Sequence, residues 1–164
     1  MPKQVIRDAK KYISPALVFH SEIVVRKAKG VYVEGTDGRR FMDFTSGLAT
    51  ANLGHSPTEV IEAARAQMDR LVHSGCIFYY ESEVELAKRL KKITPRGIDM
   101  FFFSNSGAEA VEGAIKLARF YTGRQGILAF MGGFHGRTYG ALTLTASAVK
   151  YRKKYHPLLP SVYH

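Results

Sequence analysis

Two short loops of the sequence combine residue types that suit an anion and a flat ring. The first loop, Ser-Asn-Ser-Gly-Ala at residues 104–108, lies between an apolar run and a helical pattern. A helix begins with free backbone N–H groups and a partial positive charge, so a phosphate or carboxylate is its natural ligand. Gly107 lets the backbone approach such an anion closely, and Ser106 adds a hydroxyl donor. The alternative interpretation is that Ser106 only caps the helix and Gly107 only makes the turn.

The second loop, Gly-Gly-Phe-His-Gly-Arg-Thr at residues 132–138, follows the next apolar run. The Phe134 ring can stack on a flat ligand, His135 can stack beside it or form a hydrogen bond, and Arg137 can hold a carboxylate through two parallel hydrogen bonds. Taken singly, the same residues also fit a core phenylalanine, a loop histidine and a surface ion pair. Together, the two loops predict a site for a small planar phosphate ester and an amino or keto acid.

The elements around these loops are predicted to be a strand, a helix and a second strand. Residues 99–106 are expected to form a short apolar strand that is covered on both faces. An apolar stripe at helical spacing then runs from Val111 to Tyr121, and Gly123 predicts the end of that helix. The apolar run at 126–133 completes a βαβ unit, which indicates a parallel sheet. Ligands of such sheets bind beyond the carboxyl ends of the strands, which is where both loops are expected to lie.

The amino-terminal part of the sequence has a different pattern. Residues 22–44 alternate and are rich in Val, Tyr and Phe, which predicts antiparallel strands with a hairpin turn at residues 36–38. Residues 45–55 contain glycine and small residues and are expected to form a loop. Two helices are expected to follow, each opened by a capping box, in which Ser56 pairs with Glu59 and Ser82 pairs with Glu85.

Composition and charge narrow the class of protein. The 164 residues are 46% hydrophobic, contain one cysteine (Cys76), and include neither a secretory signal nor an apolar run long enough for a membrane span. We therefore expect a cytoplasmic protein. The net charge is +10, and residues 113–164 carry eight Lys and Arg without any Asp or Glu. A basic nucleic-acid-binding module is one interpretation; the other is that acidic partners lie on another chain or another segment.

Three separated segments resemble the class III aminotransferases, a pyridoxal-phosphate-dependent family that includes 4-aminobutyrate, ornithine and acetylornithine aminotransferases. They are FFSNSGAEAVEGAIKLARFYTGR at 102–124, AFMGGFHGRTYGAL at 129–142 and DGRRFMDFTSGLATANLGH at 37–55. The resemblance covers the chain from about residue 15, and Ser-Gly-Ala-Glu-Ala is closest to the 4-aminobutyrate branch. It implies an α/β protein of the PLP-transferase fold type I. Residues 1–55 would carry antiparallel strands of the small domain, and residues 56–164 would begin the large doubly wound, mainly parallel domain that binds the cofactor.

The resemblance also assigns roles to residues. The cofactor pyridoxal 5′-phosphate (PLP) would be bound by Ser106, Gly107, Ala108, Phe134 and His135. The substrate would be bound by Arg137, Leu48 and Tyr79. The resemblance implies no metal site. It places the lysine that forms the Schiff base, and the carboxylate that pairs with the pyridine nitrogen, beyond His164. We therefore expect no catalytic residue in the chain and no transamination by these 164 residues alone.

The implied reaction moves an amino group from an amino acid, such as 4-aminobutyrate or another omega-amino donor, to a 2-oxo acid such as 2-oxoglutarate. Racemases and aminomutases of the same family remain an alternative, because no residue of the sequence separates them from aminotransferases. The resemblance further implies a homodimer. From the residues we expect no membrane partner, because no apolar run is long enough, and no nucleic-acid partner, because a recognition signature is lacking.

Overall fold

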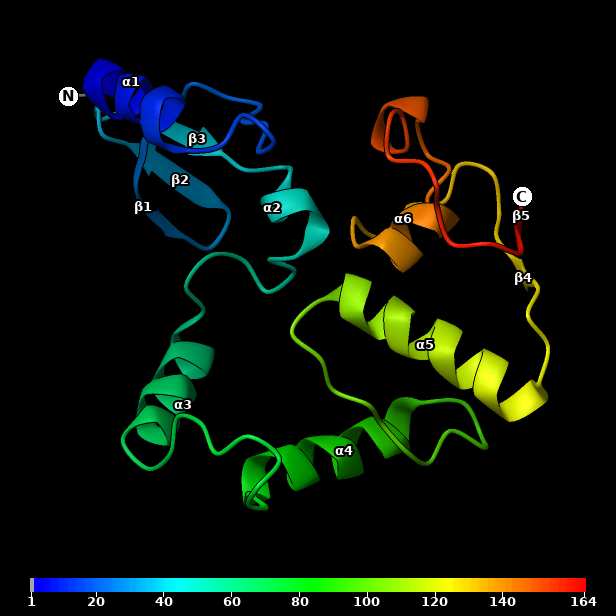
Figure 1. Cartoon of the computed structure of the whole chain (residues 1–164). Coiled ribbons are helices and arrows are strands. Elements are labelled where there is room, and N and C mark those ends of the chain that lie inside the picture. Colours follow the sequence, from blue (N-terminus) through cyan, green and yellow to red (C-terminus); the bar gives the residue numbers. More distant parts are fainter. Residues whose placement is uncertain (1) are drawn as a thin grey trace. The chain divides into compact units, whose positions relative to one another are not determined.

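The computed structural model describes residues 2–164, which divide into two compact units between Tyr79 and Tyr80. Figure 1 shows the helices and strands of each unit along the chain. The division predicted from the sequence, between residues 55 and 56, separates functional regions and stays a prediction. Among residues 2–164, none of the helices combines the length and the apolar character needed to cross a bilayer.

The first unit contains helix α1 (Pro2–Tyr12) and a three-stranded antiparallel sheet. The strand order is β1 (Val25–Lys29), β2 (Tyr32–Gly35) and β3 (Arg40–Met42). The turn between β2 and β3 contains Gly38 at φ +83° and an Asp37 carboxylate that accepts a hydrogen bond from Arg39 N at 3.1 Å. The antiparallel strands and the hairpin predicted over residues 22–44 are therefore confirmed.

Two further helical segments follow in this unit, the short turn α2 (Ser46–Ala49) and helix α3 (Thr58–Met68). The capping box predicted at Ser56 is wrong, because α3 begins after Pro57 and no side chain caps it. Ser56 has a φ of +49°, whereas a capping serine needs an extended backbone to place its hydroxyl over the first turn.

The second unit contains α4 (Glu81–Ile93), α5 (Gly107–Thr122), α6 (Tyr139–Leu144) and the 3₁₀ turn η1 (Val149–Tyr151). Strands β4 (Ile127–Leu128) and β5 (Val162–Tyr163) pair in parallel. The capping box predicted at Ser82 is also wrong, because α4 begins earlier, after Tyr80, and no side chain caps it. A small core joins α5 to this sheet and to α6; its buried members are Ile115, Ala129 and Leu144.

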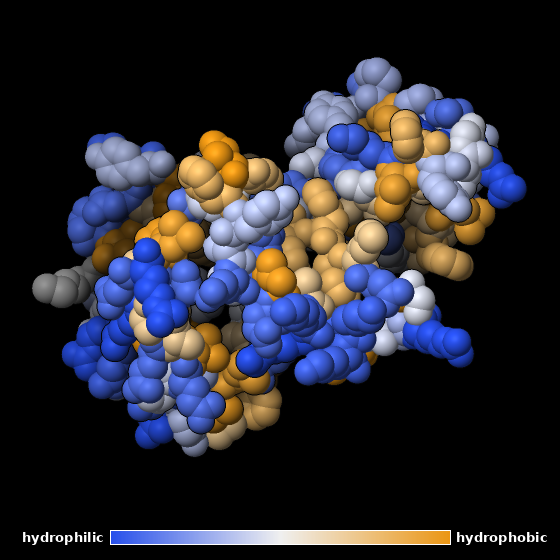
Figure 2. Space-filling model, turned by 90° about the horizontal axis from the view of Figure 1, so that it is seen from below, coloured by the Kyte–Doolittle hydropathy of each residue, from blue (hydrophilic) through white to orange (hydrophobic). Residues whose placement is uncertain are grey.

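The buried strand predicted over residues 99–106 is not formed. Helix α5 follows as expected, but the buried strand predicted over residues 126–133 is reduced to the two residues of β4, and the Leu128 side chain is 72% exposed. Residues 99–104 belong to no helix or strand, and the Phe102 side chain is 75% exposed. A strand is held by hydrogen bonds to a neighbour, and no described segment pairs with this one. Other large apolar side chains are exposed as well, and Figure 2 shows several such patches on one face.

Candidate functional site

The first turn of α5 is closed by a variant of the capping box, in which the glutamate binds the residue before the N-cap. Ser106 has an extended backbone, and its Oγ accepts a hydrogen bond from Glu109 N at 3.2 Å. In return, Glu109 Oε2 accepts one from Asn105 N at 2.7 Å. The helix therefore begins at Gly107, and the N–H groups of Gly107 and Ala108 have no hydrogen-bond partner among the described residues. These two donors, together with the positive end of a 16-residue helix, favour an anion.

The second predicted loop lies beside this helix end. An added Cβ at Gly136 would lie 2.7 Å from the Ala108 Cβ, so the two backbones approach closely there. Gly136 also has a φ of +130°, a conformation that favours glycine. Phe134 is 53% exposed, and its ring forms a T-shaped pair with the Tyr151 ring at a centroid distance of 5.3 Å. Arg137 forms no ion pair with any described residue.

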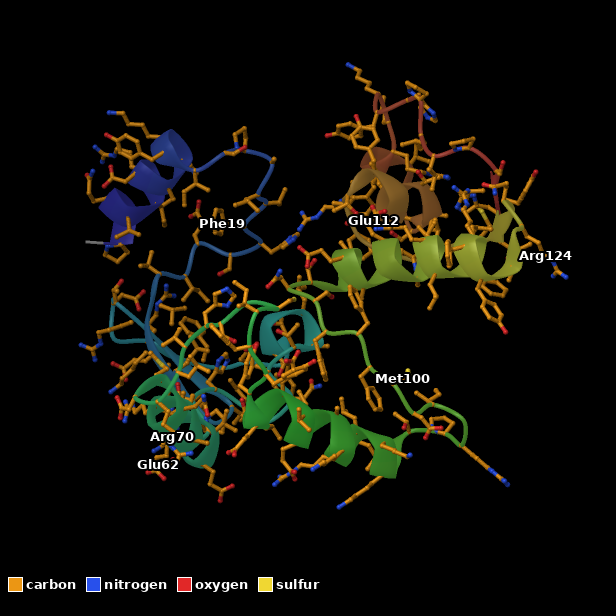
Figure 3. The ribbon with its side chains drawn as sticks, turned by 60° about the horizontal axis from the view of Figure 1, so that its bottom comes forward. Phe19, Glu62, Arg70, Met100, Glu112 and Arg124 are labelled. Carbon is orange, nitrogen blue, oxygen red and sulfur yellow. The ribbon has the colours of Figure 1, made fainter. Side chains whose placement is uncertain are left out.

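Glu112 links the second loop to α5 through hydrogen bonds, and no pattern in the sequence had indicated this role. One oxygen, Oε1, accepts hydrogen bonds from Thr138 Oγ1 at 2.6 Å, Gly140 N at 2.9 Å and Ala141 N at 3.1 Å. This carboxylate therefore caps α6 from one turn along α5, and Figure 3 shows its side chain lying between the two helices. Carboxylates accepting backbone N–H groups form the stronger class of protein hydrogen bonds, so Glu112 fixes where the loop lies.

Thr145 holds the other side of the loop through hydrogen bonds, and the sequence had not indicated this role either. It is fully buried, and its Oγ1 accepts a hydrogen bond from His135 N at 2.9 Å. The same hydroxyl lies 3.1 Å from the carbonyl oxygens of Gly136 and Ala141, to either of which it can donate. The partners of Thr145 lie four to ten residues away, so only a general preference of Ser and Thr for backbone partners could have suggested this role.

These elements enclose an open pocket with a volume of about 670 Å³. No acidic residue among the described residues 2–164 lines it, and its wall includes Phe134 and Arg137 beside the two residues with free N–H groups. The lining residues are Gly107, Ala108, Val111, Phe134, His135, Gly136, Arg137 and Thr138. Five of the predicted site residues thus lie around one pocket. Ser106 is not in the wall, because its hydroxyl is used by the cap.

The other two predicted residues belong to the first unit. Leu48 lies on the turn α2 with its side chain 83% exposed, and Tyr79 is fully exposed at the end of that unit. Their roles in substrate binding stay predictions.

Comparison with known proteins decides the family. The family model of the class III aminotransferases matches residues 14–164, which is most of the chain. The chain belongs to the class III aminotransferases. Acetylornithine aminotransferase from Archaeoglobus fulgidus is 41% identical over 157 residues, covering 96% of this chain and 41% of the relative. A probable 4-aminobutyrate aminotransferase from Bacillus subtilis is 39% identical, covering 93% and 36%. Isoleucine 2-epimerase from Lentilactobacillus buchneri is 35% identical, covering 99% and 36%.

Solved transaminase structures share the fold. An (S)-enantioselective omega-transaminase from Thermomicrobium roseum is 32% identical with a TM-score of 0.87, over 99% of this chain and 39% of that one. The predicted fold class, an α/β protein of the PLP-transferase type, is therefore confirmed. The chain spans about two fifths of the length of the relatives that it matches.

Class III aminotransferases are PLP-dependent, and an ornithine aminotransferase from Toxoplasma gondii with the same fold has been crystallised with PLP partly occupying its active site. The residues of the pocket fit this group. A Cβ added at Gly107 would meet no atom within 4 Å, so the backbone at the start of α5 is open to a ligand. The exposed Phe134 ring offers a flat surface for a pyridine, and no carboxylate in the wall would repel the phosphate charge.

Proposed function

We propose that this chain supplies the cofactor phosphate site and the substrate carboxylate site of a PLP-dependent aminotransferase. The observation that carries the proposal is the pair of unpartnered N–H groups at Gly107 and Ala108, which open into a pocket with Phe134 and Arg137 in its wall. Two directed donors at a helix N-terminus suit a phosphate, and a guanidinium without an acidic partner suits a carboxylate.

Each residue then has a separate task. Gly107 and Ala108 donate hydrogen bonds to the phosphate, Phe134 covers one face of the ring, and His135 lies beside that ring. Arg137 binds the substrate carboxylate and orients the amino acid. When bound, PLP supplies an electron sink that stabilises negative charge on the substrate carbon next to the amino group. Leu48 and Tyr79 are proposed as further substrate contacts.

Glu112 and Thr145 act through the loop rather than on the ligand. Glu112 holds Thr138 and the start of α6, while Thr145 holds the backbone of His135. Phe134 and Arg137 therefore project from a backbone that is fixed on both sides. Such preorganisation reduces the ordering cost of binding.

For the complete protein we propose transfer of an amino group from an amino acid, such as 4-aminobutyrate or another omega-amino donor, to a 2-oxo acid such as 2-oxoglutarate. The acetylornithine and 4-aminobutyrate relatives support transamination. Racemisation remains the second candidate, because isoleucine 2-epimerase is 35% identical over nearly the whole chain. We further propose a cytoplasmic homodimer.

Binding to the pocket can be measured by NMR on the 164-residue chain. The probe is pyridoxine 5′-phosphate, which lacks the aldehyde that would react with the twelve lysines of the chain. We expect the largest amide shifts at Gly107 and Ala108, because their N–H groups would bind the phosphate. Shifts confined to the basic run 150–154 would refute the proposed site.

A pair of glycine variants separates ligand binding from folding. Gly107→Val adds a side chain in front of the N–H groups without meeting another atom at Cβ, so we expect about tenfold weaker binding and an unchanged melting temperature. Gly126→Ala is the control, because its Cβ makes only an ordinary contact with Tyr163 in the same unit. Equal effects of the two variants on affinity would contradict the assignment.

Activity is tested in a hybrid in which residues 14–164 replace the matching segment of the Archaeoglobus fulgidus enzyme. We expect amino transfer to 2-oxoglutarate. In that hybrid, Arg137→Ala is expected to raise the KM for the substrates about 10- to 100-fold, which is the value of a charged hydrogen-bonded pair, and to leave PLP affinity within about twofold. A variant that loses PLP but keeps its substrate KM would show that Arg137 binds the cofactor instead.

A further inference from the structure

Four successive residues of the first unit adopt a left-handed backbone. The φ values are +51° at Ser46, +60° at Gly47, +62° at Leu48 and +62° at Ala49, whereas the flanking threonines have negative φ. L-residues enter this region singly and at an energetic cost, because Cβ crowds the following carbonyl oxygen. Three of these four residues are not glycine, so the contacts around the turn must impose its conformation.

Hydrogen bonds within the segment close one complete turn. Ala49 N donates to Thr45 O and Thr50 N donates to Ser46 O, both at 2.9 Å. The Thr50 hydroxyl donates to Gly47 O at 2.7 Å. These bonds hold the turn once it has formed. A right-handed turn can form i to i−4 bonds as well, so they do not select the hand.

The selecting contacts come from Asp43, which precedes the turn. Its Oδ1 accepts hydrogen bonds from Thr45 N at 2.8 Å, Thr45 Oγ1 at 2.6 Å and Ser46 N at 3.1 Å. The chain therefore enters the turn with two successive N–H groups directed at one oxygen. This arrangement fixes the direction of the backbone at Ser46, where the segment that follows β3 enters the turn.

His55 in turn fixes Asp43. The His55 Nε2 lies 2.8 Å from Asp43 Oδ2, the oxygen that the turn does not use. The His55 backbone is joined to Gly30 by two hydrogen bonds, of 2.9 and 2.7 Å. The carboxylate is thus linked through His55 to Gly30, which follows β1, so a contact outside the turn also orients it.

We propose that Asp43, oriented by His55, is a positioning residue. It holds Ser46–Ala49 in the left-handed conformation and so fixes the direction in which the Leu48 side chain points. Leu48 is 83% exposed, so the backbone of the turn and not side-chain packing sets its direction. The consequence for catalysis rests on the proposed function, in which Leu48 contacts the substrate.

NMR on the 164-residue chain tests the positioning role. A positive φ brings the amide and Hα protons of one residue close together, so strong intraresidue NOEs are expected at Ser46, Leu48 and Ala49. Asp43→Ala is expected to weaken these NOEs to the level of residues with negative φ, and Asp43→Asn, which keeps the Oδ1 acceptor, to restore their strength. His55→Ala keeps the carboxylate without its anchor and is expected to weaken the NOEs at least twofold.

Val33→Ala is the control, because it loosens β2 without touching Asp43 or the turn. It is expected to lower the melting temperature and keep the NOEs. The proposal is overturned if the NOEs stay strong in Asp43→Ala, or if Val33→Ala at an equal loss of stability weakens them as much. If Asp43→Ala does not fold, His55→Ala decides, because unchanged NOEs in that folded variant would exclude the Asp43–His55 linkage as the device that holds the turn.

The functional consequence is measured separately in the hybrid enzyme. Asp43→Ala is expected to raise the KM for the amino donor about tenfold, with a smaller change in kcat and unchanged PLP affinity. A hybrid that is inactive with the unchanged sequence refutes the proposed function, while the NOEs still decide the positioning role. An active hybrid in which Asp43→Ala leaves the KM unchanged refutes the role of the turn in substrate binding.

Discussion

Replacing Ala49 by glycine should stabilise the left-handed turn, although the same replacement destabilises an ordinary helix. Ala49 has a φ of +62° and an exposed side chain, so the change removes backbone strain and little packing. Strain of this kind costs an L-residue about 1–2 kcal/mol. Glycine also loses more conformational entropy on folding, by about 0.5–1 kcal/mol relative to alanine. The net expected stabilisation is therefore between about 0 and 1.5 kcal/mol.

A matched control removes the entropic part of this estimate. Ala63 is exposed on the right-handed helix α3 of the same unit, and Ala63→Gly should cost about 0.5–1 kcal/mol through entropy alone. The entropy is common to both variants, so the difference between them equals the strain at Ala49, about 1–2 kcal/mol.

Amide hydrogen exchange measures the two effects locally, because each unit opens in parts of different stability. The reporter for the turn is Thr50 N–H, which donates to Ser46 O, and the reporter for α3 is Gln67 N–H. The ratio of the two changes in protection should be about 5- to 30-fold in favour of Ala49→Gly. If both replacements lower protection equally, Ala49 does not have a positive φ in solution and the reasoning is refuted.

Three further predictions concern the contacts that hold the two sites. Glu112→Ala leaves three donors without their acceptor and should destabilise the second unit by about 2–4 kcal/mol in urea unfolding, while Glu112→Gln, which keeps one acceptor oxygen, should cost about half as much. Gly136→Ala should cost about 2–3 kcal/mol and weaken pyridoxine 5′-phosphate binding, because its φ is +130° and the added Cβ would crowd Ala108; unchanged melting and binding would contradict this. The Thr45 hydroxyl, His55 and the Thr45 N–H hold the pKa of Asp43 below its ordinary value of 3.8. The stabilisation is therefore present above about pH 4 and is lost as the pH falls through the lowered pKa, so Thr50 protection should fall with acid in the unchanged chain and stay flatter in Asp43→Asn.

Local patterns predicted those parts of the fold whose partners lie close in the sequence. The hairpin formed as expected, because alternating residues flank a turn that glycine and aspartate stabilise at Gly38 and Asp37. Helix α5 begins and ends where Ser106 and Gly123 indicate, and Gly123 adopts the left-handed C-cap conformation at φ +68°. In both cases the determining contacts span at most a few residues.

The capping signal shows the limit of such patterns. A serine followed three residues later by glutamate occurs at 56–59, 82–85 and 106–109, but the side chains form the box only in the last case. Ser106 has the extended backbone that a cap requires. Ser56 has a positive φ, and Ser82 lies inside α4. The side chains were suitable in all three places, and the backbone conformation at each serine decided whether the box formed.

The sequence by itself determined the residue types of the two loops, the start of α5 and hence the helix end that we propose as the anion site. The same residues carried the resemblance to the class III family, which the comparisons confirm. Only the tertiary structure decided that Glu112 reaches Thr138 across 26 residues and that Asp43 and His55 hold a left-handed turn. It also left the apolar run at 99–104 unpaired. The physical reason is common to all three: a hydrogen bond between distant residues depends on where both partners lie after folding, and no local pattern specifies that.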